Sequence, residues 1–220
     1  MPGPRGAALL ALALVGGACG GRGCGLQGRP PATPPVVKDK DGRIHYVVDR
    51  KPYRAFYDSM GQLERIEYDS NGDGRGDYLV HYDGARRVGL VEVDEDFDGW
   101  VDRWEHYDVS GGLERVGRAR RGPGHRADRW EYPATPERPA RTEYDEDGDG
   151  KIDRTEIQRD GQVVRVEIDA DRDGVADRWQ AWEGGRLVSE DLDTDADGRP
   201  DRRIRYGRDG RVRGIDRMKP

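Results

Sequence analysis

The feature that most constrains this chain is a nine-residue pattern, Asp-x-Asp/Asn-x-Asp-Gly-x-x-Asp, that recurs at a nearly constant interval. Its copies begin at residues 69, 94, 145, 169 and 193, so successive copies start 25, 51, 24 and 24 residues apart. The interval of 51 spans two periods, and a degenerate copy fills it. Residues 126–130 (Arg-Ala-Asp-Arg-Trp) match residues 175–179, whereas the first acidic positions of that copy have become Arg120, Gly122 and Gly124. A fixed short period predicts a repeat architecture in which small units stack on one another.

The alternating carboxylates of the pattern are typical of a loop that binds a hard cation through oxygen ligands. Carboxylates at positions 1, 3 and 5 can converge on one point, because the glycine at position 6 permits a sharp turn with positive φ. Ca²⁺ takes about six to eight oxygen ligands, whereas Mg²⁺ releases its bound waters reluctantly. The intact loops contain none of the thiolate or imidazole ligands that zinc and copper prefer. We therefore expect Ca²⁺.

The predicted metal ligands occupy positions 1, 3, 5 and 9 of the five intact loops. They are Asp69, Asn71, Asp73, Asp77, Asp94, Asp96, Asp98, Asp102, Asp145, Asp147, Asp149, Asp153, Asp169, Asp171, Asp173, Asp177, Asp193, Asp195, Asp197 and Asp201. Aspartate and glycine also mark ordinary surface turns. Nineteen aspartates and one asparagine in twenty slots are hard to explain by turn preference alone.

The loops resemble those of known calcium-binding families only in part. An EF-hand needs a bidentate glutamate at position 12 and two flanking helices. Position 12 here reads Val80, Glu105, Glu156, Gln180 and Ile204, and the flanking segments are rich in strand-forming residues. The pattern is more similar to the calcium loops of thrombospondin type 3 repeats and of FG-GAP β-hairpins. In FG-GAP hairpins, positions 1, 3, 5 and 9 supply side-chain oxygens between two antiparallel strands. The resemblance covers the loops alone and does not imply a propeller.

The segments between the loops alternate in polarity and contain a second, shorter turn. Each intact loop is preceded by an acidic residue and then an apolar residue. A glycine-containing turn lies about midway between one loop and the next. The unit is therefore strand, short turn, strand, calcium loop. We expect an all-β fold, an antiparallel meander of 24–25-residue hairpin repeats with roughly a dozen strands and the calcium loops along one edge. The short turns, such as residues 57–63, also resemble the YD repeats of Rhs-type proteins.

The composition predicts a thin core. Only 34% of the residues are hydrophobic, whereas 37% are charged. We expect the tyrosines and tryptophans to form cross-strand ladders covered by arginine stems, and bound metal to supply part of the missing stabilisation.

The N-terminal residues are typical of an export signal. Arg5 precedes an apolar run, and Gly16-Gly17-Ala18-Cys19 resembles a bacterial lipoprotein cleavage site except at Gly16, where leucine is usual. We expect a signal peptide over residues 1–18, lipidation of Cys19, a Gly/Pro-rich tether over 19–35 and a folded domain over 36–220. The alternative is ordinary secretion, in which Cys19 and Cys24 are free to form a disulfide. Either way we expect an exported protein, which is a lipoprotein of the cell envelope or outer membrane in the first case and a secreted protein in the second.

Two classes of function fit these features. The first is a calcium-binding repeat module, anchored in the envelope by its lipid, with a structural, adhesion or binding role and an unknown protein or glycan ligand. The second is a calcium-stabilised accessory or shell part of a secreted enzyme or toxin system. The chain is almost entirely repeat and leaves no room for a catalytic insert, so we expect no enzymatic activity. The net charge of −6 and the absence of a basic groove argue against nucleic acid as a partner.

Overall fold

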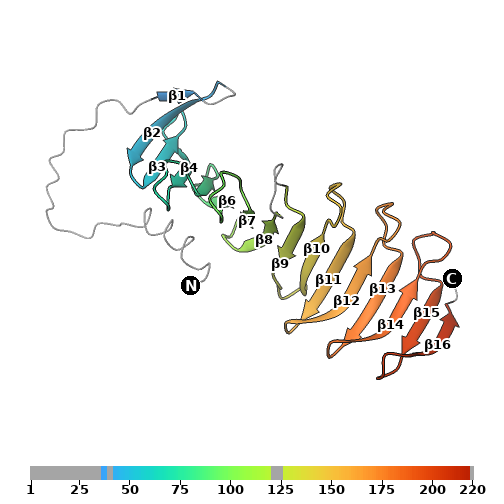
Figure 1. Ribbon diagram of the computed structural model, residues 1–220. Coiled ribbons are helices and arrows are strands. Elements are labelled where there is room, and N and C mark those ends of the chain that lie inside the picture. The colour runs from blue at the N-terminus through green and yellow to red at the C-terminus, as the bar shows by residue number, and fades with distance from the viewer. Residues whose placement is uncertain (1–35, 39–41, 120–125, 219–220) are drawn as a thin grey trace.

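The computed structural model describes residues 36–38, 42–119 and 126–218. All regular elements of these residues are strands, which form one open sheet in which each strand pairs antiparallel with its neighbours in sequence (Figure 1). The strands are β1 (Val36–Lys38), β2 (Ile44–Arg50), β3 (Tyr53–Tyr57), β4 (Leu63–Tyr68), β5 (Tyr78–Tyr82), β6 (Val88–Val93), β7 (Arg103–Tyr107), β8 (Leu113–Arg118), β9 (Arg129–Tyr132), β10 (Ala140–Tyr144), β11 (Arg154–Arg159), β12 (Gln162–Ile168), β13 (Arg178–Glu183), β14 (Arg186–Leu192), β15 (Arg202–Tyr206) and β16 (Val212–Arg217). The predicted all-β meander is confirmed, but its described residues form sixteen strands where roughly a dozen were expected.

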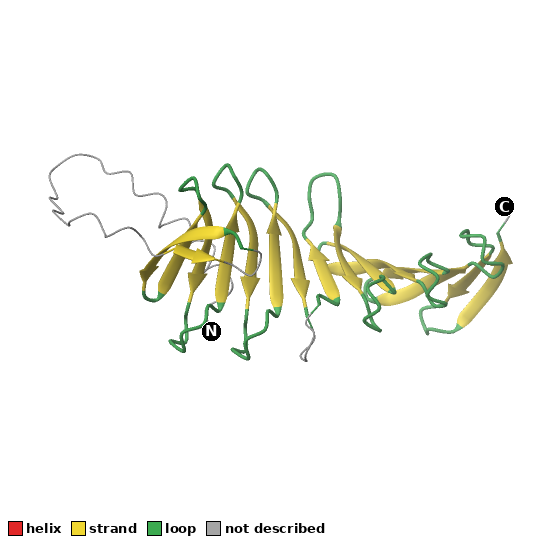
Figure 2. Cartoon of the chain, turned by 90° about the horizontal axis from the view of Figure 1, so that it is seen from above, coloured by secondary structure: helices red, strands yellow, loops and turns green. Residues whose placement is uncertain are grey.

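The two edges of the sheet differ as the sequence predicts. Short turns project from one edge and the acidic loops from the other (Figure 2). The sheet also twists along its length: β10 to β16 face the viewer in Figure 1, whereas the N-terminal strands face the viewer in Figure 2. Strands have an intrinsic right-handed twist, which accumulates across a long open sheet.

The short turns have a local cause. In the turn between β3 and β4, Asp58 Oδ1 accepts hydrogen bonds from the backbone N–H groups of Met60 (2.8 Å) and Gln62 (2.7 Å). Gly61 has a φ of 78°, and the register shifts by one residue between Phe56 and Tyr57. Asp83 and Asp108 make the equivalent bonds in the next two hairpins. In the Tyr-Asp pairs that resemble YD repeats, the aspartate therefore accepts hydrogen bonds that stabilise a hairpin turn with an adjacent β-bulge.

The apolar core lies in the N-terminal half of the sheet. Ile66, Val80, Val91 and Val93 form its buried centre, and partly buried tyrosines pack around them. The register places Ile66 opposite Val80 and Val80 opposite Val91, so one face of β4, β5 and β6 carries a continuous apolar row. The expected tyrosine ladder continues on this face, where the rings of Tyr53 and Tyr68 stack with centroids 4.8 Å apart.

In the C-terminal half, the same row becomes largely polar. Continuing through the register from Val91, it includes Glu105, Glu131, Glu156 and Glu190. Each of these carboxylates forms an ion pair with an arginine: Arg103 with Glu105, Arg118 and Arg129 with Glu131, Arg154 with Glu156, and Arg178 with Glu190. Arginine guanidinium groups also lie over aromatic rings; Arg154 Cζ lies 3.9 Å from the ring centroid of Tyr144. Half of the sheet therefore has little apolar burial to stabilise it.

Candidate metal sites

The five intact loops follow β4, β6, β10, β12 and β14, so that all of them project from the same edge of the sheet. Backbone hydrogen bonds connect each loop to the next where the hairpins meet. The N–H of Asp94 donates to the carbonyl of Asp77 (2.8 Å), and the N–H of Asp169 donates to the carbonyl of Asp153 (2.9 Å). The meander therefore positions the loops in a row, with one hairpin between neighbours.

Within each loop, backbone N–H groups orient the aspartate at position 1. In the loop over residues 145–153, Asp145 Oδ1 accepts from the N–H of Gly148 (2.6 Å) and Asp145 Oδ2 accepts from the N–H of Gly150 (2.8 Å). Asp69, Asp169 and Asp193 accept the equivalent pair of bonds in their own loops. Charge-assisted bonds of this kind hold the carboxylate inward before any ion arrives.

The aspartate at position 9 closes the loop from its other end. Asp153 Oδ2 accepts from the N–H of Glu146 (2.6 Å). Asp77 is the most buried of this group, at 1% exposed, and accepts from both the N–H (2.7 Å) and the hydroxyl (2.6 Å) of Ser70. The position-9 carboxylates therefore have a structural role in addition to the predicted role as ligands.

Two positions in every intact loop adopt the left-handed conformation, and the sequence indicates only one of them. Position 6 is always glycine, with φ between 82° and 100°. Position 4 also has positive φ, although Phe97 (63°), Arg172 (66°) and Ala196 (59°) occupy it in three loops. Sequence reasoning missed position 4, and the glycine at that position in the other two loops, Gly72 and Gly148, is the signal that could have indicated it.

In four loops the structure brings three carboxylates together, with one oxygen of each lying within 4.8 Å of the others. The groups are Asp94, Asp96 and Asp102; Asp145, Asp147 and Asp153; Asp169, Asp171 and Asp177; and Asp193, Asp195 and Asp197. These groups can hold a metal ion. Three of them combine positions 1, 3 and 9, and the last combines positions 1, 3 and 5. The loop over residues 69–77 has Asn71 at position 3 and no such carboxylate triplet among the described residues.

The predicted ligands at position 5, and Asp201 at position 9, have local partners; of these residues, only Asp197 also belongs to a triplet. At position 5, Asp73, Asp98, Asp149, Asp173 and Asp197 each accept a hydrogen bond through Oδ1 from the N–H of the residue at position 7. At position 9 of the last loop, Asp201 accepts from the N–H (3.0 Å) and the hydroxyl of Thr194. The position-5 side chains are thus held at the tip of the loop.

One carboxylate oxygen indicates directly that the loops suit a cation. Asp94 Oδ1 is buried and has no hydrogen-bond partner. In the other four loops, the N–H of the residue at position 4 donates to the equivalent oxygen, but the N–H of Phe97 does not. A buried charged oxygen without a partner is costly, and a bound cation would satisfy it. The donor set around it, Asp96 and Asp102, contains only oxygen ligands.

The carboxylates of the last loop differ in how readily they ionise. Desolvation opposes ionisation of Asp193, but the backbone N–H groups of Gly198 and Ala196 outweigh it and lower the pKa of this carboxyl. At Asp195, desolvation and then repulsion from the Asp197 carboxylate raise the pKa. The loop thus combines one firmly ionised carboxylate with a second whose charge a metal ion would stabilise.

The degenerate loop differs from its sequence-based alignment. The N–H of Asp128 donates to the carbonyl of Arg118, the bond that position 9 makes in intact loops to the residue before position 1. Ala119, whose N–H donates to the carbonyl of Asp102, therefore occupies position 1. This loop is one residue longer than the others, and assigning Arg120 to position 1 was wrong. Residues 120–125, including Gly122 and Gly124, lie outside the described part of the chain.

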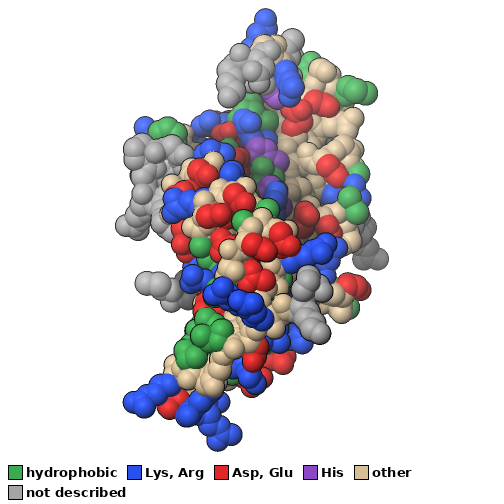
Figure 3. Space-filling view, turned by 90° about the vertical axis from the view of Figure 1, so that its right-hand side faces the viewer, with side chains coloured by type: hydrophobic (Ala, Val, Ile, Leu, Met, Phe, Trp, Pro, Cys, Tyr) green, Lys and Arg blue, Asp and Glu red, His purple; other side chains and the backbone are tan. Residues whose placement is uncertain are grey.

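Charged side chains of both signs occur on the face at the C-terminal end of the sheet. Viewed from the C-terminal end, acidic and basic side chains intermingle over the visible face (Figure 3). An open hollow of about 450 Å³ lies at the short-turn edge, away from the acidic loops. Glu156, Val166 and Trp182 are among its lining residues.

The fold and loops define an open all-β repeat protein whose acidic loops can hold metal ions. No family model matches the chain, and no curated protein matches it. One similar solved structure is the S. aureus TarM G117R mutant in complex with Fondaparinux, alpha-GlcNAc-glycerol and UDP, with a TM-score of 0.20 and 5% identity. The match covers 66% of this chain and 21% of that chain, so the chain spans about a fifth of that protein. A likeness this weak carries no argument about fold or function.

Proposed function

We propose that the protein is a calcium-binding repeat module with a structural or binding role and no catalytic activity of its own. The observation that carries this proposal is the recurrence of convergent carboxylates along one sheet edge, with the unpartnered Asp94 Oδ1 among them. Ca²⁺ is favoured over softer metals because the donors are all oxygen, and over Mg²⁺ because Ca²⁺ accepts about six to eight oxygen ligands in flexible geometry whereas Mg²⁺ releases its waters reluctantly.

Bound calcium would also stabilise the folded state. Each loop concentrates several carboxylates, whose mutual repulsion opposes folding. The C-terminal half of the sheet, where Val166 is the one buried hydrophobic residue among the described strands β10 to β16, offers little apolar burial against this. Calcium at about 100 times its dissociation constant would stabilise the fold by about 2.7 kcal/mol for each independent site.

Calorimetric titration of the full chain with Ca²⁺, combined with thermal melting in Ca²⁺ and in EDTA, tests this proposal. We expect about five ions, each with a dissociation constant on the order of 10⁻⁴–10⁻³ M. The loop over residues 69–77 would be the weakest, since Asn71 contributes no charge. Asp96→Asn should remove or weaken one site, whereas Asp108→Asn, in a short turn on the other edge, should leave the stoichiometry unchanged. A stoichiometry of zero or one at millimolar Ca²⁺, or equal melting temperatures in Ca²⁺ and EDTA, would refute the proposal.

We further propose that the module is exported and anchored by lipid at Cys19, from which the tether over residues 19–35 extends. Cys19, Cys24, the leader and the tether lie outside the described residues, and the proposal rests on their sequence. No helix in the described part of the chain is long and apolar enough to cross a membrane. Cys19→Ser should release the protein from the membrane fraction, and Cys24→Ser is the matched control. An unchanged membrane fraction in Cys19→Ser would contradict the assignment.

The second function expected from the sequence, an accessory part of an enzyme or toxin system, drew on the Tyr-Asp turns. Asp58, Asp83 and Asp108 have a local role there as acceptors for turn N–H groups. That role accounts for the motif, so the motif adds no support to the second function.

A further inference from the structure

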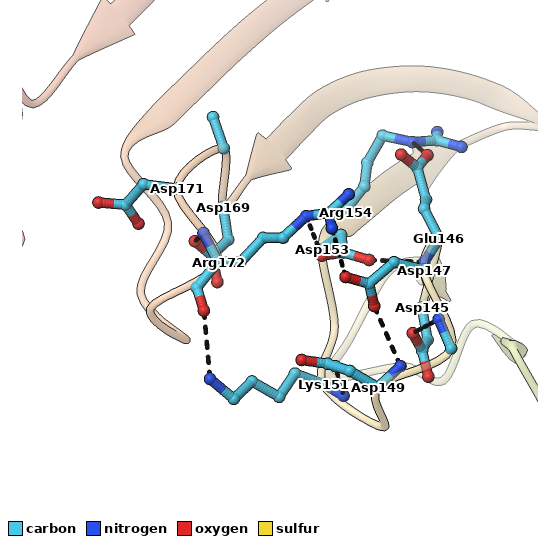
Figure 4. A network of polar contacts seen from close by, with 12 residues as sticks. Asp145, Glu146, Asp147, Asp149, Lys151, Asp153, Arg154, Asp169, Asp171 and Arg172 are labelled. Atoms are coloured by element: carbon cyan, nitrogen blue, oxygen red, sulfur yellow. Dashed lines mark hydrogen bonds and ion pairs between the residues drawn. The ribbon is translucent and has the colours of Figure 1, made fainter.

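One contact between neighbouring loops stands out among the interactions of the acidic edge. Arg172, at position 4 of the loop over residues 169–177, extends away from its own loop and into the loop over residues 145–153 (Figure 4). Its Nη1 lies 2.5 Å from Asp147 Oδ2, and its Nε lies 3.8 Å from Asp153 Oδ1. Asp147 and Asp153 are two of the three carboxylates that converge in that loop with Asp145.

Hydrogen bonds hold the backbone of Arg172 in place beside this contact. The N–H of Arg172 donates to Asp169 Oδ1 (2.8 Å), which holds the residue in the left-handed conformation that position 4 requires. In the opposite direction, Lys151 Nζ donates to the carbonyl of Arg172 (3.1 Å), so the two loops are connected twice. In the five intact loops, Arg172 is the one basic residue at position 4; the others have glycine, phenylalanine or alanine.

We propose that Arg172 is a built-in competitor for the metal ion of the preceding loop, so that the loop over residues 145–153 binds Ca²⁺ more weakly than its ligand set would allow. This inference rests on the proposed calcium binding. A Ca²⁺ ion held by Asp145, Asp147 and Asp153 would be close to the guanidinium, and like charges at that range repel. Either the arginine leaves and its ion pair is lost, or it stays and opposes the ion. Both outcomes weaken binding.

The size of the effect follows from the exposure of the pair. The Arg172 side chain is 55% exposed, so solvent screens much of the interaction. We therefore expect Arg172→Ala to strengthen binding at the preceding loop about threefold, which corresponds to about 0.65 kcal/mol. Arg172→Gln, which keeps most of the side chain but not its charge, should give a similar result.

The test is an NMR titration of the isotope-labelled full chain with Ca²⁺, because it reports on each loop separately. The Gly150 N–H donates to Asp145 Oδ2 and reports on the loop that Arg172 enters, and Gly99 reports in the same way on the loop over residues 94–102. In Arg172→Ala, the Gly150 midpoint should fall about threefold while the Gly99 midpoint stays unchanged. Arg159→Ala removes the same charge at the short-turn edge and should move neither midpoint.

A converse variant tests whether position 4 itself is responsible. Ala196 occupies this position in the last loop, with a φ of 59°. Ala196→Arg should raise the midpoint of Gly174, in the loop over residues 169–177, about threefold. An unchanged Gly174 midpoint would contradict a general effect of charge at position 4.

The two proposals fail in different ways. A Gly150 midpoint that is equal or higher in Arg172→Ala would overturn the competition while leaving calcium binding intact. A wild-type chain in which none of the loop glycines responds to millimolar Ca²⁺ would overturn both.

Discussion

The dual role of the position-9 aspartates leads to a prediction about the loop over residues 69–77. Asp77 is 1% exposed, and its Oδ2 accepts from the N–H (2.7 Å) and hydroxyl (2.6 Å) of Ser70 and from the N–H of Asn71 (3.2 Å). Asp73, at position 5 of the same loop, is exposed, and its Oδ1 accepts one backbone bond, from the N–H of Arg75 (2.7 Å). Both are predicted metal ligands, but only Asp77 holds the loop together from within.

The hydrogen bonds of Asp77 determine how much its removal should lower the free energy of unfolding. Hydrogen bonds to a charged acceptor contribute about 1.5–3 kcal/mol each, and removing the acceptor leaves buried donors unsatisfied. Relief from burying the carboxylate offsets part of the loss. We therefore expect Asp77→Ala to lower the free energy of unfolding of the metal-free protein by about 3 kcal/mol. Asp73→Ala should lower it by no more than about 0.5 kcal/mol, as exposed substitutions usually do.

The assay is denaturation followed by far-ultraviolet circular dichroism, first in EDTA and then in Ca²⁺. For a chain of this size, about 3 kcal/mol corresponds to a fall in melting temperature of roughly 6–12 °C. In Ca²⁺, both variants should also lose the stabilisation that this loop receives from its ion. Equal melting temperatures for Asp77→Ala and Asp73→Ala in EDTA would refute the structural role of Asp77.

Three further predictions concern the glycines, the core and the histidines. Gly198→Ala places a side chain at a φ of 82° and should lower the free energy of unfolding by about 1 kcal/mol in thermal melting, whereas Gly89→Ala, with open space around it, should be neutral. Val93→Ala, at a site 1% exposed, should cost about 2 kcal/mol in urea denaturation, and Val212→Ala, at a site 53% exposed, no more than about 0.5 kcal/mol. Burial lowers the pKa of His106 below its ordinary 6.5, so the unfolded chain binds the proton first and stability falls as the pH drops below that value. Melting at pH 7 and pH 5 should show a smaller loss in His106→Gln than in the wild type, and an equal loss would contradict this.

Much of the architecture is readable from local patterns. Alternation of polarity predicts strands, and a turn at the end of every alternating segment leaves an antiparallel meander as the simplest arrangement. The acidic residue followed by an apolar residue before each loop, as at Glu67 and Tyr68, places the two on opposite faces of the sheet. These rules operate over a few residues, so the repeat encodes them afresh in every copy.

The loops were predictable in outline and not in register. Glycine at position 6 predicts a left-handed conformation there. Phe97 and Ala196 at position 4 do not predict one, because their positive φ follows from how the loop closes rather than from the residue type. In the degenerate loop, the backbone hydrogen bond from the N–H of Asp128 to the carbonyl of Arg118 shows that the loop contains one extra residue. An alignment that matches only Asp128 to position 9 does not reveal this residue. Pairing between strands, which are distant in sequence from the eroded positions, determines that register.

The sequence by itself determined the all-β repeat, the edge on which the acidic loops project and the oxygen-rich chemistry of those loops, because each depends on residues close together in the chain. Only the tertiary structure decided where the core lies and which loops affect one another. The row that begins with Ile66 and Val80 continues as Glu156 and Glu190, a change visible only when strands are paired across the sheet. Likewise, Arg172 meets Asp147 across 25 positions of sequence because the hairpin of β11 and β12 brings neighbouring loops side by side. Contacts between repeats depend on how strands pair and twist, and no single repeat contains that information.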